Sequence, residues 1–275
     1  MNDDRRRRLD GIAPRPGVPK PDPILVVKAT SRSFGGLRAV DVEHLEVERG
    51  TITALIGPNG AGKTTLFNVL TGFDRADGGT WTFEGAPLAG RRAYQVARAG
   101  MIRTFQLTKA LARLTVLDNL LLAAPAQRGE RFSRALTRTW RSQEGRNRQQ
   151  AQSLLDRFGL AAMSGHFAGT LSGGQRKLLE MARSLMADPR LLMLDEPMAG
   201  VNPALRRSLL DHIEAIRTEG TTVVFIEHDM DVVMDISDWV VVMAEGRVIA
   251  EGPPTAVGRD PTVIDAYLGR RGRAG

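Results

Sequence analysis

The sequence predicts an α/β fold around a mainly parallel sheet, and two patterns support this prediction. From residue 63 onward, helix-like periodicity alternates with short apolar runs. Strands that alternate with helical segments connect as right-handed βαβ units, which build a parallel sheet. In addition, the segment Thr51–Ile56 is apolar at Ile52, Ala54, Leu55 and Ile56, as expected for a strand that is covered on both faces.

The first 23 residues differ in composition from the rest of the chain. Four arginines at positions 5–8 precede a stretch that is rich in proline and glycine, a composition typical of disordered segments. We therefore expect a disordered N-terminal extension over residues 1–23 and ordered structure from Ile24 onward. The first strands are predicted at Ile24–Val27, Val40–Val47 and Thr51–Ile56.

Helices and strands then alternate toward the end of the chain. The main predicted helices are Lys63–Leu70, Ala93–Ala99, Ser172–Met186, Ala204–Arg217 and Asp229–Ile236. The predicted strands are Leu191–Leu194 and Val223–Ile226, followed by a hairpin of Trp239–Met243 and Val248–Glu251.

Between residues 107 and 169 the strand signal disappears. Helical candidates at Val116–Ala124 and Asn147–Phe158 indicate that this stretch is a helical insertion. The ordered domain is therefore expected over residues 24–269, with a basic C-terminal tail over residues 270–275.

Composition excludes several classes of protein. The 275 residues include no cysteine, so neither a disulfide framework nor thiolate chemistry is predicted. The longest apolar candidate, residues 116–126, is interrupted by Asp118, Asn119 and Pro125, so no membrane span is expected. The arginines at positions 5–8 have no apolar stretch behind them, unlike a secretory signal. We therefore expect a cytoplasmic protein whose connection to a membrane comes through a partner.

The net charge of +7 raises the question of nucleic acid, because a basic protein attracts phosphate backbones and anionic lipid headgroups alike. The arginines gather in residues 5–8, 128–148 and 270–273, and the aromatic residues, 5% of the chain, are not interleaved with them. That leaves little for base stacking. We interpret these runs as solvated tails and helix faces, and we expect no specific nucleic-acid partner.

The strongest chemical signal is a glycine-rich loop that fits the pattern G-x-x-x-x-G-K-[ST]. A triphosphate needs several backbone N–H groups converging on one point, so side chains must be absent where the loop wraps the phosphate. The helix that follows adds its dipole, a lysine reaches the β- and γ-phosphates, and a threonine hydroxyl ligates Mg²⁺. The loop follows an apolar strand and opens a helix, as this chemistry requires. Its residues are Gly57, Pro58, Asn59, Gly60, Ala61, Gly62, Lys63, Thr64 and Thr65.

A second signal is the apolar strand Leu191–Leu194, which ends in Asp195 and Glu196. Open α/β sheets bind ligands at this edge. Asp195 is predicted to hold Mg²⁺, and Glu196 to accept a proton from the attacking water. A strand that simply ends in solvated acids is the alternative, and it would be favoured if the phosphate loop were absent.

A third signal is Leu171 followed by Ser172, Gly173, Gly174 and Gln175. Ser172 is a good N-cap, and the glycines expose backbone N–H groups, so the stretch can be a plain helix start or a second anion site. Two half-sites far apart on one chain suggest that a nucleotide is completed by a second copy.

In order and spacing, these three motifs resemble those of the ABC (ATP-binding cassette) transporter ATPases over residues 24–269. The resemblance implies a P-loop NTPase core with a mixed, mainly parallel sheet, an antiparallel β subdomain and an inserted helical subdomain. It also implies ATP and Mg²⁺ as ligands, with ATP hydrolysis coupled to transport. The expected partners are a second ABC ATPase subunit in a head-to-tail dimer, transmembrane permease subunits and an extracytoplasmic solute-binding protein. The protein would then lie on the inner face of the cell membrane.

The resemblance assigns further site residues. Gln106 matches the glutamine that contacts Mg²⁺ and the attacking water, and His228 matches the switch histidine that contacts the γ-phosphate. Phe34 lies where the family places an aromatic ring against adenine, although an ordinary core phenylalanine is the alternative. Lys63, Gln106, Glu196 and His228 are thus the expected catalytic set, and Thr64, Gln106 and Asp195 the expected metal ligands.

Several local stretches look like those of branched-chain amino-acid importers, including Ile102–Gln106, Ala199–Pro203 and Glu227–Met230. Importers of urea and short amides share much of this pattern, and lipopolysaccharide-export ATPases are close relatives. Asn202 departs from the family, many of whose members have aspartate there. The rival interpretations are an exporter ATPase, a soluble non-transport ABC ATPase acting on ribosomes or DNA, and a nucleotide-gated binding module without catalysis.

Overall fold

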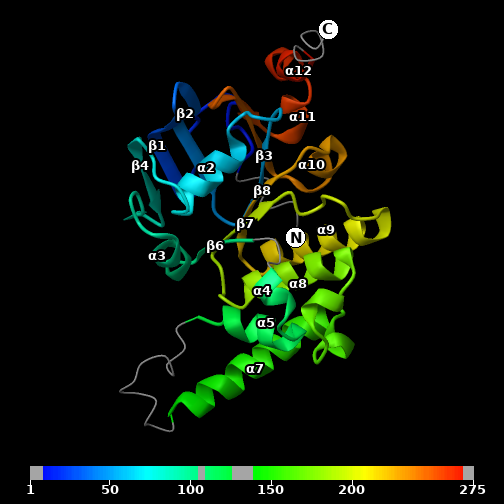
Figure 1. Ribbon diagram of the computed structural model, residues 1–275. Coiled ribbons are helices and arrows are strands. Elements are labelled where there is room, and N and C mark those ends of the chain that lie inside the picture. Colours follow the sequence, from blue (N-terminus) through cyan, green and yellow to red (C-terminus); the bar gives the residue numbers. More distant parts are fainter. Residues whose placement is uncertain (1–8, 105–108, 126–138, 269–275) are drawn as a thin grey trace. The chain divides into compact units, whose positions relative to one another are not determined.

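The computed structural model describes residues 9–104, 109–125 and 139–268 (Figure 1). It divides into two compact units. The first comprises Met1–Arg103, Arg190–Ala199 and Leu210–Gly275, and the second comprises Thr104–Pro189 and Gly200–Leu209. The second unit thus extends beyond the insertion predicted for residues 107–169.

The first unit contains two sheets. The antiparallel sheet has the order β2-β1-β4-β5 and is built from β1 (Pro23–Phe34), β2 (Leu37–Glu48), β4 (Gly78–Phe83) and β5 (Ala86–Pro87). The second sheet has the order β10-β9-β3-β8-β7-β6. Its strands are β3 (Ile52–Ile56), β6 (Met101–Arg103), β7 (Leu191–Asp195), β8 (Thr222–Ile226), β9 (Trp239–Ala244) and β10 (Arg247–Gly252). All its neighbouring strands are parallel except the β9–β10 hairpin, so the predicted α/β class is confirmed.

In the core of this unit, side chains of helix α2 (Lys63–Leu70) and of both sheets form one apolar cluster. Leu66, Phe67, Val69 and Leu70 of α2 are buried in it. Strand residues of both sheets share this cluster, among them Val40, Trp81, Phe83, Leu55, Ile226 and Val241. Burying these large apolar side chains stabilises the unit and fixes where α2 begins. The remaining helices of the unit are α3 (Ala93–Arg98), α10 (Met230–Ile236), α11 (Pro254–Val257) and α12 (Pro261–Leu268).

The second unit is helical. It contains α4 (Lys109–Ala112), α5 (Val116–Ala123), α7 (Thr139–Arg157) and α8 (Gly173–Leu185). Its core includes Val116 and Leu120 of α5, Leu155 of α7, and Leu179 and Ala182 of α8. Helix α9 (Pro203–Thr218) begins in this unit and ends in the first. None of the described helices is long and apolar enough to span a membrane.

The prediction of a disordered extension up to residue 23 is wrong for residues 9–22. Leu9 and Val18 are 3% and 6% exposed and belong to the apolar core cluster. We call residues 9–22 the strap. Its proline and glycine content suggested disorder, but these two apolar side chains and one lysine have buried partners elsewhere in the first unit. Residues 1–8 lie outside the described residues.

A buried carboxylate holds the strap. Glu251 of β10 accepts hydrogen bonds from Val18 N (3.0 Å), Lys20 Nζ (3.0 Å) and Trp239 Nε1 (2.8 Å). The Lys20 ammonium also lies 4.4 Å from the centre of the Trp239 ring. Burial lowers the pKa of Lys20, and its ion pair with Glu251 opposes that shift. A buried charge is tolerated only when it is paired and hydrogen-bonded, so the strap depends on this cluster.

We predict that Lys20→Met lowers the free energy of unfolding by about 3 kcal/mol, because it leaves the Glu251 carboxylate buried without its counter-ion. Arg38→Met is the control, since the Arg38–Asp41 pair is exposed and its loss costs less than about 1 kcal/mol. Urea denaturation measures both variants. Equal, small effects would contradict the role of the buried pair.

Candidate functional site

The phosphate loop, residues 57–62, joins β3 to α2 and has the shape that its glycines permit. Gly57 and Gly62 have φ angles of 146° and 99°, which L side chains rarely adopt. A Cβ on Gly57 would lie 2.0 Å from Met243 O, and one on Gly62 would lie 2.1 Å from Ala39 O. The loop is therefore packed against the backbone of β9 and β2 with no room for side chains at these two positions.

Lys63 is the first residue of α2 and is only 6% exposed. Its ammonium donates hydrogen bonds to Gly57 O (2.7 Å) and Pro58 O (3.1 Å). The N-cap residue Gly62 has no side chain, so no side-chain cap covers the start of α2. The positive charge of Lys63 and the helix N-terminus therefore act at the same loop, as anion binding requires.

Two carboxylates lie at the end of β7: Asp195 is its last residue, and Glu196 follows it. Arg103 donates two hydrogen bonds: Nη2 to Asp195 Oδ2 (2.7 Å) and Nη1 to Asn68 Oδ1 of α2 (2.5 Å). The Arg103 side chain is 7% exposed. It ties the end of β6, the helix after the phosphate loop and the carboxylate of Asp195 into one network. Arg103 was not among the site residues predicted from the sequence, although it lies within the importer-like stretch Ile102–Gln106.

Glu196 and His228 face each other. Glu196 has a φ of 48°, a left-handed conformation that is uncommon outside glycine. His228 Nε2 lies 2.7 Å from Glu196 Oε1, and both side chains are about half-exposed. The predicted base and the predicted switch histidine thus form a hydrogen-bonded pair that is open to solvent.

A third carboxylate, Glu227, is buried beside this pair. One carboxylate oxygen accepts a hydrogen bond from Met198 N (2.9 Å), and the other accepts one from His228 N (3.2 Å). The residue is 5% exposed. Burial raises the pKa of Glu227, while the two N–H groups act in the opposite direction. Glu227 was not predicted as a site residue, because an acidic residue at a strand end resembles a solvated acid in the sequence.

Phe34 ends β1 and is 48% exposed, so the alternative of a core phenylalanine is wrong. The Arg32 guanidinium lies 4.5 Å from the centre of its ring. The other face of an exposed aromatic ring is suited to stacking with a planar base.

Ser172 lies in the helical unit and is the N-cap of α8. Its hydroxyl accepts a hydrogen bond from Gln175 N (3.2 Å), and Gln175 Oε1 accepts one from Ser172 N (2.9 Å). The two bonds form a capping box. The plain helix start that the sequence allowed is thus present. Ser172 and Gly173 at this start are accessible to solvent.

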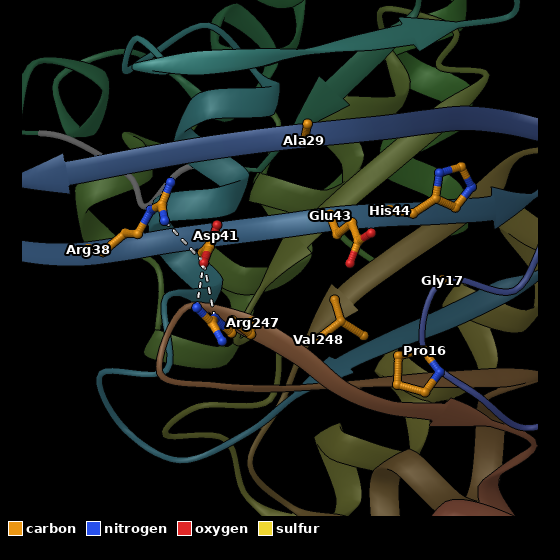
Figure 2. Close-up of a pocket in the computed structure, with 9 residues that line it drawn as sticks. All are labelled: Pro16, Gly17, Ala29, Arg38, Asp41, Glu43, His44, Arg247 and Val248. Atoms are coloured by element: carbon orange, nitrogen blue, oxygen red, sulfur yellow. Dashed lines mark hydrogen bonds and ion pairs between the residues drawn. The ribbon is translucent and has the colours of Figure 1, made fainter.

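The structure brings Lys63, Thr64, Asp195, Glu196 and His228 into one unit and places Ser172, Gly173, Gly174 and Gln175 in the other. Gln106 lies outside the described residues. A separate cleft between the strap, β1, β2 and β10 contains none of the predicted site residues. There, the Asp41 carboxylate bridges Arg38 (3.4 Å) and Arg247 (3.0 Å) (Figure 2).

Comparisons with known proteins identify the family of this chain. The family described as ABC transporter matches residues 40–199, and the family described as branched-chain amino acid ATP-binding cassette transporter matches residues 247–272. The high-affinity branched-chain amino acid transport ATP-binding protein BraF of Pseudomonas aeruginosa is 42% identical over 250 residues, covering 90% of this chain and 98% of BraF. A probable branched-chain amino acid transport ATP-binding protein, LivG, of Archaeoglobus fulgidus is 41% identical over 246 residues, covering 90% and 95%.

Solved structures give the same result. A nucleotide-free ATP-binding cassette from an ABC transporter has a TM-score of 0.79 and 36% identity, covering 89% of this chain and 98% of that one. The ADP conformation of an ATP-binding cassette has a TM-score of 0.78 and 35% identity, covering 90% and 99%. The chain belongs to the ABC transporter family and, within it, to the ATP-binding subunits.

We predict that Gly62→Ala abolishes nucleotide binding, because the new Cβ would meet Ala39 O and displace the phosphate loop. Gly165→Ala is the matched control, since a Cβ there meets nothing within 4 Å and its φ is not left-handed. Binding of a fluorescent ATP analogue measures both. Wild-type affinity of Gly62→Ala would show that the loop does not need this close approach.

Proposed function

We propose that the chain hydrolyses ATP at the edge of its parallel sheet and that this hydrolysis energises the import of branched-chain amino acids or related small solutes. The observation that carries the proposal is that the phosphate loop, the Asp195–Glu196 pair and His228 lie at the ends of three neighbouring parallel strands of the first unit, β3, β7 and β8. Catalysis would then consist mostly of positioning and charge neutralisation.

Each residue has a role that follows from its surroundings. Lys63 supplies a fixed positive charge to the β- and γ-phosphates. Glu196 is half-exposed and hydrogen-bonded to His228, so it can orient or deprotonate the attacking water, while His228 contacts the γ-phosphate. Phe34 would stack on adenine through its exposed face.

Thr64 and Asp195 fit Mg²⁺, because this ion prefers oxygen ligands and is usually held by one or two protein groups together with phosphates and water. Asp195 is partly exposed at a strand end, and Thr64 is exposed at the start of α2. When bound, Mg²⁺ would neutralise negative charge between the β- and γ-phosphates. Gln106 is proposed as a further contact by family resemblance.

We further propose a head-to-tail dimer with a second cassette, either another copy of this chain or a related one. Ser172 and Gly174 of one subunit would cover the nucleotide held by the phosphate loop of the other. The exposure of Ser172 and Gly173 at the start of α8 supports this arrangement. Closure around two nucleotides, followed by hydrolysis and reopening, would then drive transmembrane permease subunits from the inner face of the membrane.

The names of the similar proteins support branched-chain amino acids as the substrate and, with import, an extracytoplasmic solute-binding protein as a partner. The match at residues 247–272 supports the same branch over an exporter. A soluble cassette acting on nucleic acid predicts salt-sensitive co-purification of RNA or DNA instead of permeases.

We predict that Glu196→Gln lowers ATP hydrolysis at least about 100-fold, because the amide cannot take a proton, and that it accumulates an ATP-bound dimer. Phosphate release and size-exclusion chromatography with ATP and magnesium measure the two effects. Glu144→Gln, at an exposed residue of α7 in the helical unit, is the control. If Glu196→Gln hydrolysed ATP at the wild-type rate, Glu196 would not be the general base.

The transport proposal predicts that the chain co-purifies with the permeases of its gene neighbourhood. In proteoliposomes, leucine with its binding protein should then raise ATP hydrolysis. A complex that hydrolyses ATP but responds to no branched-chain amino acid would contradict the substrate and leave the ATPase intact.

A further inference from the structure

Glu227 connects the two loops that carry the catalytic pair. One carboxylate oxygen accepts the backbone N–H of Met198, two residues after Glu196, and the other accepts the backbone N–H of His228. Both loops belong to the first unit. A single buried side chain therefore bonds both N–H groups and limits the distance between them.

The surroundings of Glu227 argue against a role in contacting substrate. The residue is 5% exposed, whereas the Glu196 side chain is 44% exposed. Its two oxygens already have backbone donors. A buried carboxylate is costly unless such bonds are made, so its position here requires that both loops keep their places.

We propose that Glu227 is a positioning residue for ATP hydrolysis. Its buried carboxylate fixes the loop of His228 against the segment that follows Glu196. The base and the switch histidine then keep their relative positions at the γ-phosphate. The inference rests on the proposed function of Glu196 and His228. The buried Glu227 carboxylate would then maintain the 2.7 Å distance between His228 Nε2 and Glu196 Oε1.

Glu227→Gln is the direct test. The variant keeps the size of the side chain but replaces one acceptor oxygen by an NH₂ group, which repels a backbone N–H. We expect kcat to fall about 10- to 100-fold, as misplacement of catalytic groups does, with KM and the affinity for a fluorescent ATP analogue close to wild type. Glu227→Asp, which retains both oxygens on a shorter stem, should recover part of kcat.

Glu251→Gln is the matched control, because it also removes a buried carboxylate that accepts a backbone N–H, but in the strap cluster. It should lower the melting temperature without lowering kcat. In addition, Glu227→Gln should have little further effect in a Glu196→Gln background, because residues that act as a unit are not additive. A kcat of Glu227→Gln at the wild-type level, or the same kcat loss in Glu251→Gln, would overturn the inference.

Amide hydrogen exchange separates this inference from the proposed function. The amides of Met198 and His228 should exchange slowly in wild type and faster in Glu227→Gln, while those of β8 keep their protection. Such a pattern in a wild-type protein that hydrolyses no ATP would sink the proposed function and leave the contact in place. Unchanged exchange in Glu227→Gln would sink the contact itself.

Discussion

The parallel register of β3, β8 and β7 is the constraint on which the site depends. Leu55 pairs with Ile226, and Ile226 pairs with Asp195, so the three strands end at the same level. Each chain segment that leaves this edge therefore emerges beside the others. The phosphate loop follows β3, Glu196 follows β7, and Glu227 and His228 follow β8. These candidate site residues, which are spread over residues 57–228 of the sequence, are thus brought to one edge by the parallel pairing of these strands.

Buried carboxylates then fix the segments that the sheet brings together. Glu227 joins the segment after Glu196 to the loop of His228, and Glu251 holds the strap to the hairpin of β9 and β10. Asp238 similarly accepts the backbone N–H of Ile52 at the start of β3 and pairs with the buried Arg217. In each case an acidic side chain takes backbone donors that would otherwise be buried without partners. The first unit therefore uses charge in its interior to set the position of loops.

The sequence was most informative where the pattern is local. The strands β3, β7 and β8 are short apolar runs buried on both faces, and the motifs at Gly57–Thr65, Asp195 and Glu196 follow directly from them. It missed β4, β5 and β6, because β4 is exposed along half its length and the other two have only two or three residues. It also predicted disorder for the strap, since proline and glycine content does not reveal that Val18 and Lys20 have a partner more than two hundred residues away or that Leu9 is buried in the apolar core. Glu227 and Arg103 were missed for the same reason: their function lies in contacts distant in sequence.

The central claim is that one chain carries two halves of different nucleotide sites. It is tested most directly by mixing two Glu196→Gln chains, one with Lys63→Ala and the other with Ser172→Arg, and measuring association by analytical ultracentrifugation with ATP and magnesium. Neither chain alone can build a complete site, whereas the mixture contains one intact phosphate loop facing one intact Ser172. The account predicts ATP-dependent heterodimers only in the mixture. Monomers in the mixture, or equal pairing by either chain alone, would contradict it.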